Sequence, residues 1–148
     1  MAALVKGLKS LWQHATGQKP EQPKYVLVID DDIDAVITVS HVLREAGYTL
    51  AMASDMDKAL RLLHRLPIGL VITDLWMPGR TGLDVLKKAR EIRPDTQVVI
   101  MTARGDWDTY LEANDNQALE YLQKPVRKQE LLDLARRAFE PVEAPATH

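Results

Sequence analysis

The fold is decided by the segment Leu70-Val71-Ile72-Thr73-Asp74-Leu75-Trp76-Met77-Pro78-Gly79-Arg80-Thr81-Gly82. An apolar run, residues 70–72, leads to the carboxylate of Asp74, and turn-forming residues such as Pro78 and Gly79 follow it. This pattern predicts a buried strand that brings Asp74 to its exposed end. Because a single carboxylate at a strand end is common, the next question is what the neighbouring strands bring to the same place.

Similar apolar runs recur on both sides of this segment and alternate with helical patterns. We predict strands at residues 25–29, 49–53, 70–73, 97–101 and 118–122. We predict helices at residues 34–45, 55–66, 81–92, 106–115 and 127–139. Strands that alternate with helices in this way indicate a parallel sheet with helices on both faces. The expected fold class is therefore α/β, a doubly wound five-stranded sheet in a three-layer sandwich.

The apolar content of the runs predicts the order of the strands. The runs at 25–29, 70–73 and 97–101 are nearly continuous, which is typical of central strands that are buried on both faces. The run at 49–53 is weaker, which is typical of an edge strand. Right-handed crossovers then predict the order 2-1-3-4-5. Ligands of such sheets bind at the carboxyl ends of the strands, where the first and third strands lie side by side.

Length and composition limit the class of function. The 148 residues suffice for one domain with a sizeable core, and a net charge of -2 predicts no general affinity for nucleic acid or anionic membranes. The absence of cysteine excludes disulfides, thiolate zinc sites and a cysteine nucleophile. No apolar run approaches the ~20 residues of a membrane span, and no signal peptide is recognisable. We expect a cytoplasmic protein with no transmembrane segment and no direct nucleic-acid binding.

The chain is expected to have four parts. Residues 1–16 show the periodicity of an amphipathic helix, and residues 17–23 have the composition of a linker. Residues 24–140 form the main domain, and residues 141–148 form a flexible tail. Three roles remain open for the N-terminal helix: packing on its own domain, docking or dimerisation, and weak attachment to a membrane surface.

Polar groups stand at the carboxyl ends of four predicted strands. The first strand is followed by Asp30 and Asp31, the third leads to Asp74, the fourth to Thr102, and the fifth to Lys124. Three carboxylates that pack together ionise only if a cation shares the site. Oxygen ligands without His or Cys select a hard ion, Mg²⁺ or alternatively Mn²⁺. A carboxylate in such a site can attack phosphorus, while a lysine and a hydroxyl stabilise the charge on the phosphoryl oxygens.

In combination, four motifs resemble the response-regulator receiver domain of two-component phosphorelays. They are Val26-Leu27-Val28-Ile29-Asp30-Asp31-Asp32, Asp74-Leu75-Trp76-Met77-Pro78-Gly79, Met101-Thr102-Ala103 and Tyr121-Leu122-Gln123-Lys124-Pro125. Each motif is weak alone, but their order and spacing are highly specific, and the resemblance covers residues 24–140. It implies a flavodoxin-like or receiver-like fold. It also implies a signalling module that is not an enzyme, because it catalyses only its own phosphorylation and dephosphorylation.

The resemblance also implies a role for each residue at the site. Asp74 would accept a phosphoryl group from a histidine kinase or a His-phosphotransfer protein, and would also be a ligand of Mg²⁺. Asp31 would bind Mg²⁺ directly, and Asp30 would act mainly through a metal-bound water. The backbone carbonyl of Trp76 would be a further metal ligand. Lys124 would bridge to the phosphoryl oxygens.

A switch between two states is implied by the same resemblance. Thr102 would move inward to the phosphate, and Tyr121 would rotate into the space that Thr102 leaves. This movement would change the binding of an unknown downstream protein, for which the N-terminal helix is a candidate contact. The peptide bond before Pro125 is usually cis in the family. We expect either a single-domain regulator or a fragment of a longer one.

Several positions depart from the usual receiver pattern. Trp76 follows Asp74 by two residues, and Arg104 follows Thr102 by two. In receivers these positions flank the path of the attacking water, so we hypothesise that both side chains slow autodephosphorylation. The segment at 112–117 is unusually polar and predicts a short, frayed or shifted fourth helix. Because receivers commonly dimerise through that face, we expect a monomer or a weak dimer.

Two other classes of function remain open. A pseudo-receiver would bind partners without being phosphorylated. A phosphohydrolase of the haloacid dehalogenase type would use Asp30 and Asp32, together with Thr102 and Lys124, but this assignment leaves Asp74 unexplained and lacks a later acidic pair. The aspartate that a phosphoryl donor labels distinguishes a receiver from a phosphohydrolase.

Overall fold

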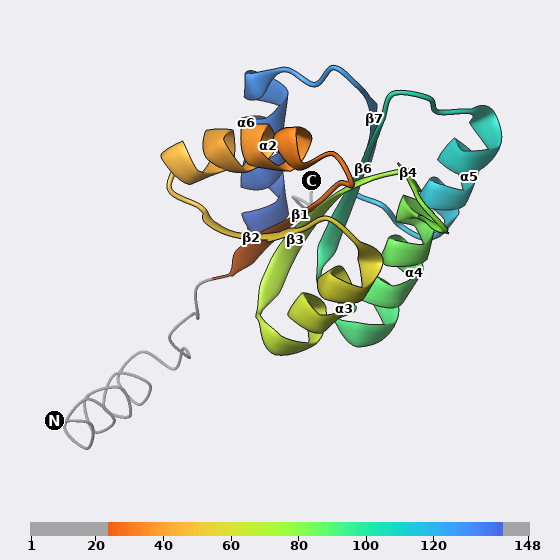
Figure 1. Ribbon diagram of the computed structural model, residues 1–148, viewed down its shortest axis with the longest axis horizontal. Coiled ribbons are helices and arrows are strands. Elements are labelled where there is room, and N and C mark those ends of the chain that lie inside the picture. Colours follow the sequence, from red (N-terminus) through yellow and green to blue (C-terminus); the bar gives the residue numbers. More distant parts are fainter. Residues whose placement is uncertain (1–23, 141–148) are drawn as a thin grey trace, which may run out of the picture.

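The central sheet of the computed structural model, which describes residues 24–140, contains five parallel strands. These are β1 (Tyr25–Ile29), β2 (Thr49–Ala53), β3 (Ile68–Asp74), β6 (Gln97–Thr102) and β7 (Glu120–Gln123). They pair in the order β2-β1-β3-β6-β7 (Figure 1), which is 2-1-3-4-5 when only the strands of this sheet are counted. The predicted α/β fold and its strand order are confirmed.

Helices cover both faces of this sheet. They are α2 (Ile33–Glu45), α3 (Met56–Arg65), α4 (Gly82–Ile92), α5 (Trp107–Asp115) and α6 (Lys128–Phe139). Figure 1 shows α2 and α6 on one face, and α3, α4 and α5 on the other. Two separate apolar cores result, one on each side of the sheet.

The central strands are apolar along most of their length because both of their faces are covered. In β1, Leu27 and Ile29 belong to the core beneath α3 and α4, whereas Val26 and Val28 belong to the core beneath α2 and α6. All four side chains are buried. A strand with one wet face would instead alternate apolar and polar residues. In β2, the edge strand, burial is less complete: Ala51 and Ala53 are buried, whereas Thr49 and Met52 are exposed.

Helix starts are fixed close to the carboxyl ends of the strands by acidic and hydroxyl caps. Asp32 accepts a hydrogen bond from the backbone N–H of Asp34 at 3.0 Å and begins α2. Asp55 accepts from the Lys58 N–H at 2.8 Å and begins α3. Such caps satisfy N–H groups that have no partner within the helix. They therefore hold the loops that surround the carboxyl edge of the sheet.

Strand β3 begins at Ile68, two residues before its predicted start. Gly69 is a poor strand former, and for this reason the sequence pattern does not include it. Its lack of a side chain is needed here, because a Cβ at this position would collide with the Phe139 ring of α6. The Thr96 hydroxyl donates to the Ile68 carbonyl at 2.7 Å and so stabilises the start of this strand.

Two further features differ from the prediction by more than one residue. Strand β7 begins at Glu120 rather than at residue 118, because the Ala118 N–H still donates to the Ala113 carbonyl of α5, at 3.0 Å. The segment after Asp74 forms a small antiparallel hairpin, β4 (Trp76–Met77) and β5 (Arg80–Thr81), where only a turn was predicted. Helix α5 is short, as the polar segment at its end predicts.

Part of the predicted organisation lies outside the described residues. This applies to the N-terminal helix at 1–16, the linker at 17–23 and the tail at 141–148. Within residues 24–140, no helix has the length and apolar character needed to cross a membrane.

Candidate functional site

Three carboxylates converge at the carboxyl ends of β1 and β3. Asp30 and Asp31 follow β1 directly, and Asp74 is the last residue of β3. The two strands are adjacent and parallel, with Ile29 paired to Thr73, so their ends lie side by side. One oxygen of each carboxylate lies within 4.8 Å of the oxygens of the other two. A set of oxygen donors this close together is typical of a divalent-metal site.

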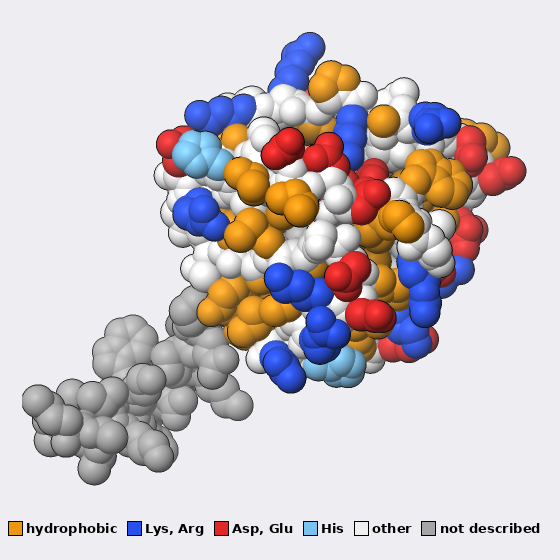
Figure 2. Space-filling view, in the orientation of Figure 1, with side chains coloured by type: hydrophobic (Ala, Val, Ile, Leu, Met, Phe, Trp, Pro, Cys, Tyr) orange, Lys and Arg blue, Asp and Glu red, His pale blue; other side chains and the backbone are white. Residues whose placement is uncertain are grey.

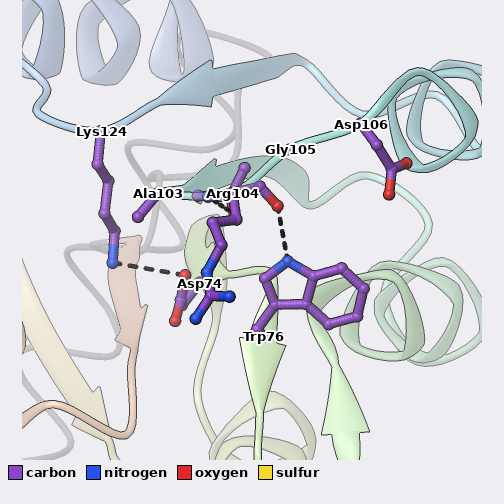
Figure 3. Close-up of a pocket in the computed structure, with 8 residues that line it drawn as sticks. Asp74, Trp76, Ala103, Arg104, Gly105, Asp106 and Lys124 are labelled. Carbon is purple, nitrogen blue, oxygen red and sulfur yellow. Dashed lines mark hydrogen bonds and ion pairs between the residues drawn. The ribbon is translucent and has the colours of Figure 1, made fainter.

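Lys124 places a cation in this cluster. It follows β7, and its backbone N–H donates to the Thr102 carbonyl at 2.8 Å. The Nζ atom lies 2.8 Å from Oδ2 of Asp30. It also lies 3.4 Å from Oδ1 of Asp74, a contact that Figure 3 shows. The Lys124–Pro125 peptide bond is cis. One ammonium group therefore contacts carboxylates from two different strands.

Burial and charge act together on the ionisation of the cluster. Burial raises the pKa of the Asp74 carboxyl above its usual value, the neighbouring Asp30 raises it further, and Lys124 partly opposes both. Burial acts to lower the pKa of Lys124, but the hydrogen bond and charge of Asp30 and the charge of Asp74 outweigh it, so this pKa is raised. The lysine is therefore charged, and three carboxylates face one cation. A divalent ion would neutralise the remaining negative charge.

Thr102 and Tyr121 lie on neighbouring strands with a glycine next to both. Thr102 is fully buried at the end of β6, and its Oγ1 accepts from the Arg104 N–H at 3.1 Å. The Tyr121 hydroxyl lies 2.7 Å from Oγ1 of Thr109 on α5. A Cβ at Gly105 would meet the Tyr121 hydroxyl at 2.5 Å and Cγ2 of Thr102 at 3.1 Å. Gly105 thus leaves the space in which the two side chains approach each other.

A pocket of 630 Å³ opens over Asp74 and is bounded by Lys124, Thr102 and the loop that follows β6. Trp76, which is 47% exposed, donates its indole Nε1–H to the Arg104 carbonyl at 2.7 Å. Figure 3 shows this bond crossing from the β4–β5 hairpin to the loop, and shows the Arg104 side chain extending toward Asp74. The hydrogen bond therefore ties together two segments on the rim of the pocket.

The structure brings together the residues that the sequence placed at the strand ends. Asp30, Asp31 and Asp74 share one cluster, Lys124 contacts two of them, and Thr102 lines the adjoining pocket. Their chemical roles, the metal-ligand role of the Trp76 carbonyl and the switch role of Tyr121 stay predictions.

Sequence reasoning missed three contributors to the site. Gly82 begins α4 against the end of β3, and a Cβ there would meet the Asp74 carbonyl at 2.5 Å. Gly105 provides space beside Thr102, and Thr109 holds the Tyr121 hydroxyl. The glycines carry a weak signal, since Gly105 follows Thr102 by three residues and Gly82 stands at the start of α4. Thr109 carries none, because its partner lies on another element.

Comparisons with known proteins agree with this geometry. The family model of the response regulator receiver domain matches residues 26–136. Transcriptional regulatory protein ZraR of Klebsiella oxytoca is 37% identical over 101 residues, which cover 68% of this chain and 23% of ZraR. The chain spans about a quarter of the length of the curated relatives it matches.

Solved structures show the same fold. A response regulator receiver domain protein from Clostridium thermocellum is 34% identical with a TM-score of 0.73, over 78% of this chain and 93% of that chain. A response regulator from Burkholderia pseudomallei contains a phosphorylated aspartic acid, a calcium ion and citrate. It is 27% identical with a TM-score of 0.71, over 75% of this chain and 65% of that chain.

The family match spans all of the strands and the helices between them, which is incompatible with the phosphohydrolase alternative. Receiver domains are phosphoacceptor signalling modules of two-component systems rather than enzymes, and the acidic cluster and Lys124 stand where such a module requires them. The chain belongs to the response regulator receiver domain family.

Proposed function

We propose that this chain accepts a phosphoryl group on Asp74 from a histidine kinase or a His-phosphotransfer protein, and that phosphorylation changes which partner protein it binds. The observation that carries the proposal is the position of Asp74. Its carboxylate ends a central strand, borders an open pocket, and lies 3.4 Å from Lys124 and beside Asp30 and Asp31. The phosphorylated aspartic acid of the Burkholderia response regulator supports the same chemistry.

The transfer itself needs a nucleophile and a way to stabilise charge. A carboxylate oxygen of Asp74 attacks the phosphorus of a phosphohistidine, the O–P bond forms, the N–P bond breaks, and the imidazole leaves with its electron pair. Asp74 Oδ1 accepts from the Leu75 N–H at 3.0 Å, which orients the carboxylate. Lys124 supplies positive charge for the phosphoryl oxygens, and the Thr102 hydroxyl supplies a donor.

The cluster fits Mg²⁺, with Mn²⁺ as an alternative, because all of its donors are oxygen atoms. Asp30, Asp31 and Asp74 would hold the ion together with the Trp76 carbonyl and water. When bound, the ion would neutralise charge on the carboxylates and on the phosphoryl oxygens. Burial is the main cause of the raised pKa of Asp74, and the charge of Asp30 is the second. A bound cation would oppose both effects and favour the ionised carboxylate.

Partner switching would begin at Thr102. Its hydroxyl would exchange the Arg104 N–H for a phosphoryl oxygen, and Tyr121 would leave Thr109 for the space that Thr102 vacates. The side chain of Tyr121 contacts α5, so the change would reach the surface of that helix. We also propose that the chain acts as a monomer or as a weak dimer.

Incorporation of phosphate from acetyl phosphate tests the proposal. We expect incorporation by the wild-type chain that requires Mg²⁺ and is lost in Asp74→Asn. Asp57→Asn, on the exposed side of α3, is the matched control and should incorporate phosphate normally. If the wild-type chain binds Mg²⁺ but incorporates no phosphate from any small donor or phosphotransfer protein, the chain is a pseudo-receiver, and the proposal is wrong.

A further inference from the structure

Helix α5 exposes an apolar stripe on its outer face. Trp107, Tyr110 and Leu111 follow the spacing of one helix face, and they are 68%, 41% and 38% exposed. The rings of Trp107 and Tyr110 stack with centroids 5.4 Å apart, and Tyr110 meets Tyr121 edge to face at 5.7 Å. The three rings therefore form one continuous aromatic row, which runs from Tyr121 on β7 to the exposed Trp107. Contiguous apolar surface of this kind marks a site where another element docks.

An acidic row runs beside this stripe. Asp108, Glu112 and Asp115 repeat at helical spacing, and α5 contains no lysine or arginine. Glu112 pairs with Lys87 of α4 at 2.5 Å, whereas Asp108 and Asp115 form no ion pair within residues 24–140. Figure 2 shows apolar and acidic side chains gathered at the edge of the molecule over this helix. A segment that docks here should combine an apolar stripe with positive charge.

We propose that residues 2–16 of the same chain dock on this face of α5. This segment repeats apolar side chains at helical spacing, and they are Leu4, Val5, Leu8, Leu11 and Trp12. It also carries Lys6 and Lys9, and no acidic residue precedes Glu21. The apolar side chains and lysines of residues 2–16 thus complement the apolar side chains and carboxylates of α5.

The connection between the two is long enough. Residues 17–23 can span about 25 Å when extended, at roughly 3.5 Å per residue. Strand β1, which they precede, is separated from β6 by β3 alone, a distance of about 10 Å at ~4.8 Å per strand. The end of α5 lies at this same end of the sheet, because the Leu119 N–H donates to the Val98 carbonyl at 2.7 Å. The linker is therefore long enough to reach the Asp115 end of α5, from which the stripe runs back toward Trp107.

Charge favours α5 over the other large apolar surface of the described domain. A groove of 680 Å³ between α2 and α6 is lined by apolar residues that include Val39 and Leu131. However, Lys124 and Lys128 also line it, with Asp32 as its only acidic residue. Lysines of the N-terminal segment would meet like charge there.

Docking on α5 has a consequence for signalling, which rests on the proposed function. The segment would cover Tyr110, which contacts Tyr121, and would compete with a partner protein for the face that adjoins the switch. The docking itself does not depend on phosphorylation, so it can be tested without metal or phosphoryl donor. If the segment does not dock, the proposed function is unaffected. If the chain is not phosphorylated, the docking is unaffected.

Paramagnetic relaxation in the full chain tests the docking. Because the chain has no cysteine, Gln13→Cys provides a single position for a spin label. We expect most of the intensity of the α5 amides to be lost, while the amides of α2 keep theirs. The pair Asp108→Lys and Asp115→Lys should restore the α5 signals, and adding Lys6→Glu and Lys9→Glu to that variant should weaken them again.

Three results would overturn the proposal. One is equal intensity loss on α2 and α5, or none on either. Another is loss on α2 and α6 in place of α5, which would place the segment in the other groove. The third comes from mixing isotope-labelled chains without the spin label and spin-labelled chains without the isotope. If the α5 signals are lost in that mixture, the occupant is a second copy.

Discussion

At the scale of single residues, the ionisation of Asp74 has a measurable effect on stability. A raised pKa means that the folded protein binds this proton more tightly than the unfolded chain. The resulting stabilisation is present at low pH and is lost as pH rises through the raised value. Above it, ionised Asp74 destabilises the metal-free fold, so we predict that Asp74→Asn increases the free energy of unfolding by on the order of 1 kcal/mol near neutral pH.

Thermal unfolding with a metal chelator present measures this difference. The advantage of Asp74→Asn should shrink as pH falls toward the ordinary value of 3.8 and should be absent below it. Asp57→Asn on the exposed side of α3 serves as the control, with little expected change. A variant that is less stable than the wild type at neutral pH would show that Lys124 outweighs burial and Asp30.

The indole of Trp76 is predicted to protect the phosphoryl group. Its Nε1–H holds the Arg104 carbonyl at 2.7 Å across the rim of the pocket, and Trp76→Phe removes this donor while keeping an aromatic ring. Because one hydrogen bond contributes about 1 kcal/mol, we expect the phosphorylated form to decay roughly fivefold faster. The decay rate of the acetyl-phosphate-labelled protein measures this. Equal rates in Trp76→Phe and in the control Trp107→Phe would contradict the shielding role.

At the scale of elements, one arginine joins the ends of two helices. The Arg90 guanidinium of α4 donates to the Asn116 carbonyl at 3.4 Å and to the Gln117 carbonyl at 2.7 Å, just after α5. It also donates to the carbonyls of Pro94 and Thr96 in the loop before β6. Burial lowers the pKa of this arginine, and Gln117 has a left-handed φ of 63°. The side chain thus supplies donors to the carbonyls of 116 and 117 in the turn that ends α5.

We predict that Arg90→Ala lowers the free energy of unfolding by about 2–3 kcal/mol, because it leaves several carbonyls without a donor. Urea denaturation measures the change. Lys88→Ala, on the same helix, removes an exposed ion pair with Glu91 and should cost less than ~1 kcal/mol. Similar losses in the two variants would show that Arg90 contributes only as a surface charge.

The elements could be predicted where one periodicity dominates. Continuous apolar runs predicted β1 and β6, and the residues after each run predicted that Asp30, Asp74 and Lys124 share one edge of the sheet. Parallel pairing alone brings these ends together, so no knowledge of side-chain packing was needed.

Other features depend on partners that are distant in the sequence. Arg90 has the position of an ordinary polar helix residue, and only the folded chain brings the carbonyls of 116 and 117 to it. The bond between Thr109 and Tyr121 joins two elements in the same way. The β4–β5 hairpin has two residues in each strand, which is too short for a periodicity to appear.

At the scale of the whole molecule, cation binding should stabilise the entire domain. The carboxylates come from the ends of β1 and β3, so the site exists only in the folded chain. We predict that Mg²⁺ at about 100 times its Kd raises the free energy of unfolding by ~2.7 kcal/mol. Thermal unfolding with and without Mg²⁺ measures this. The increase caused by Mg²⁺ should be much smaller in Asp31→Asn. An equal increase in that variant would show that Mg²⁺ binds at another site.

The proposed function depends most directly on which aspartate carries the phosphate. The chain would be labelled with acetyl phosphate and Mg²⁺, reduced with borohydride, which converts an aspartyl phosphate to homoserine, and digested for peptide mass spectrometry. We predict homoserine at position 74 and unmodified aspartate at 30 and 31. Homoserine at position 30, or at no position after confirmed labelling, would contradict it.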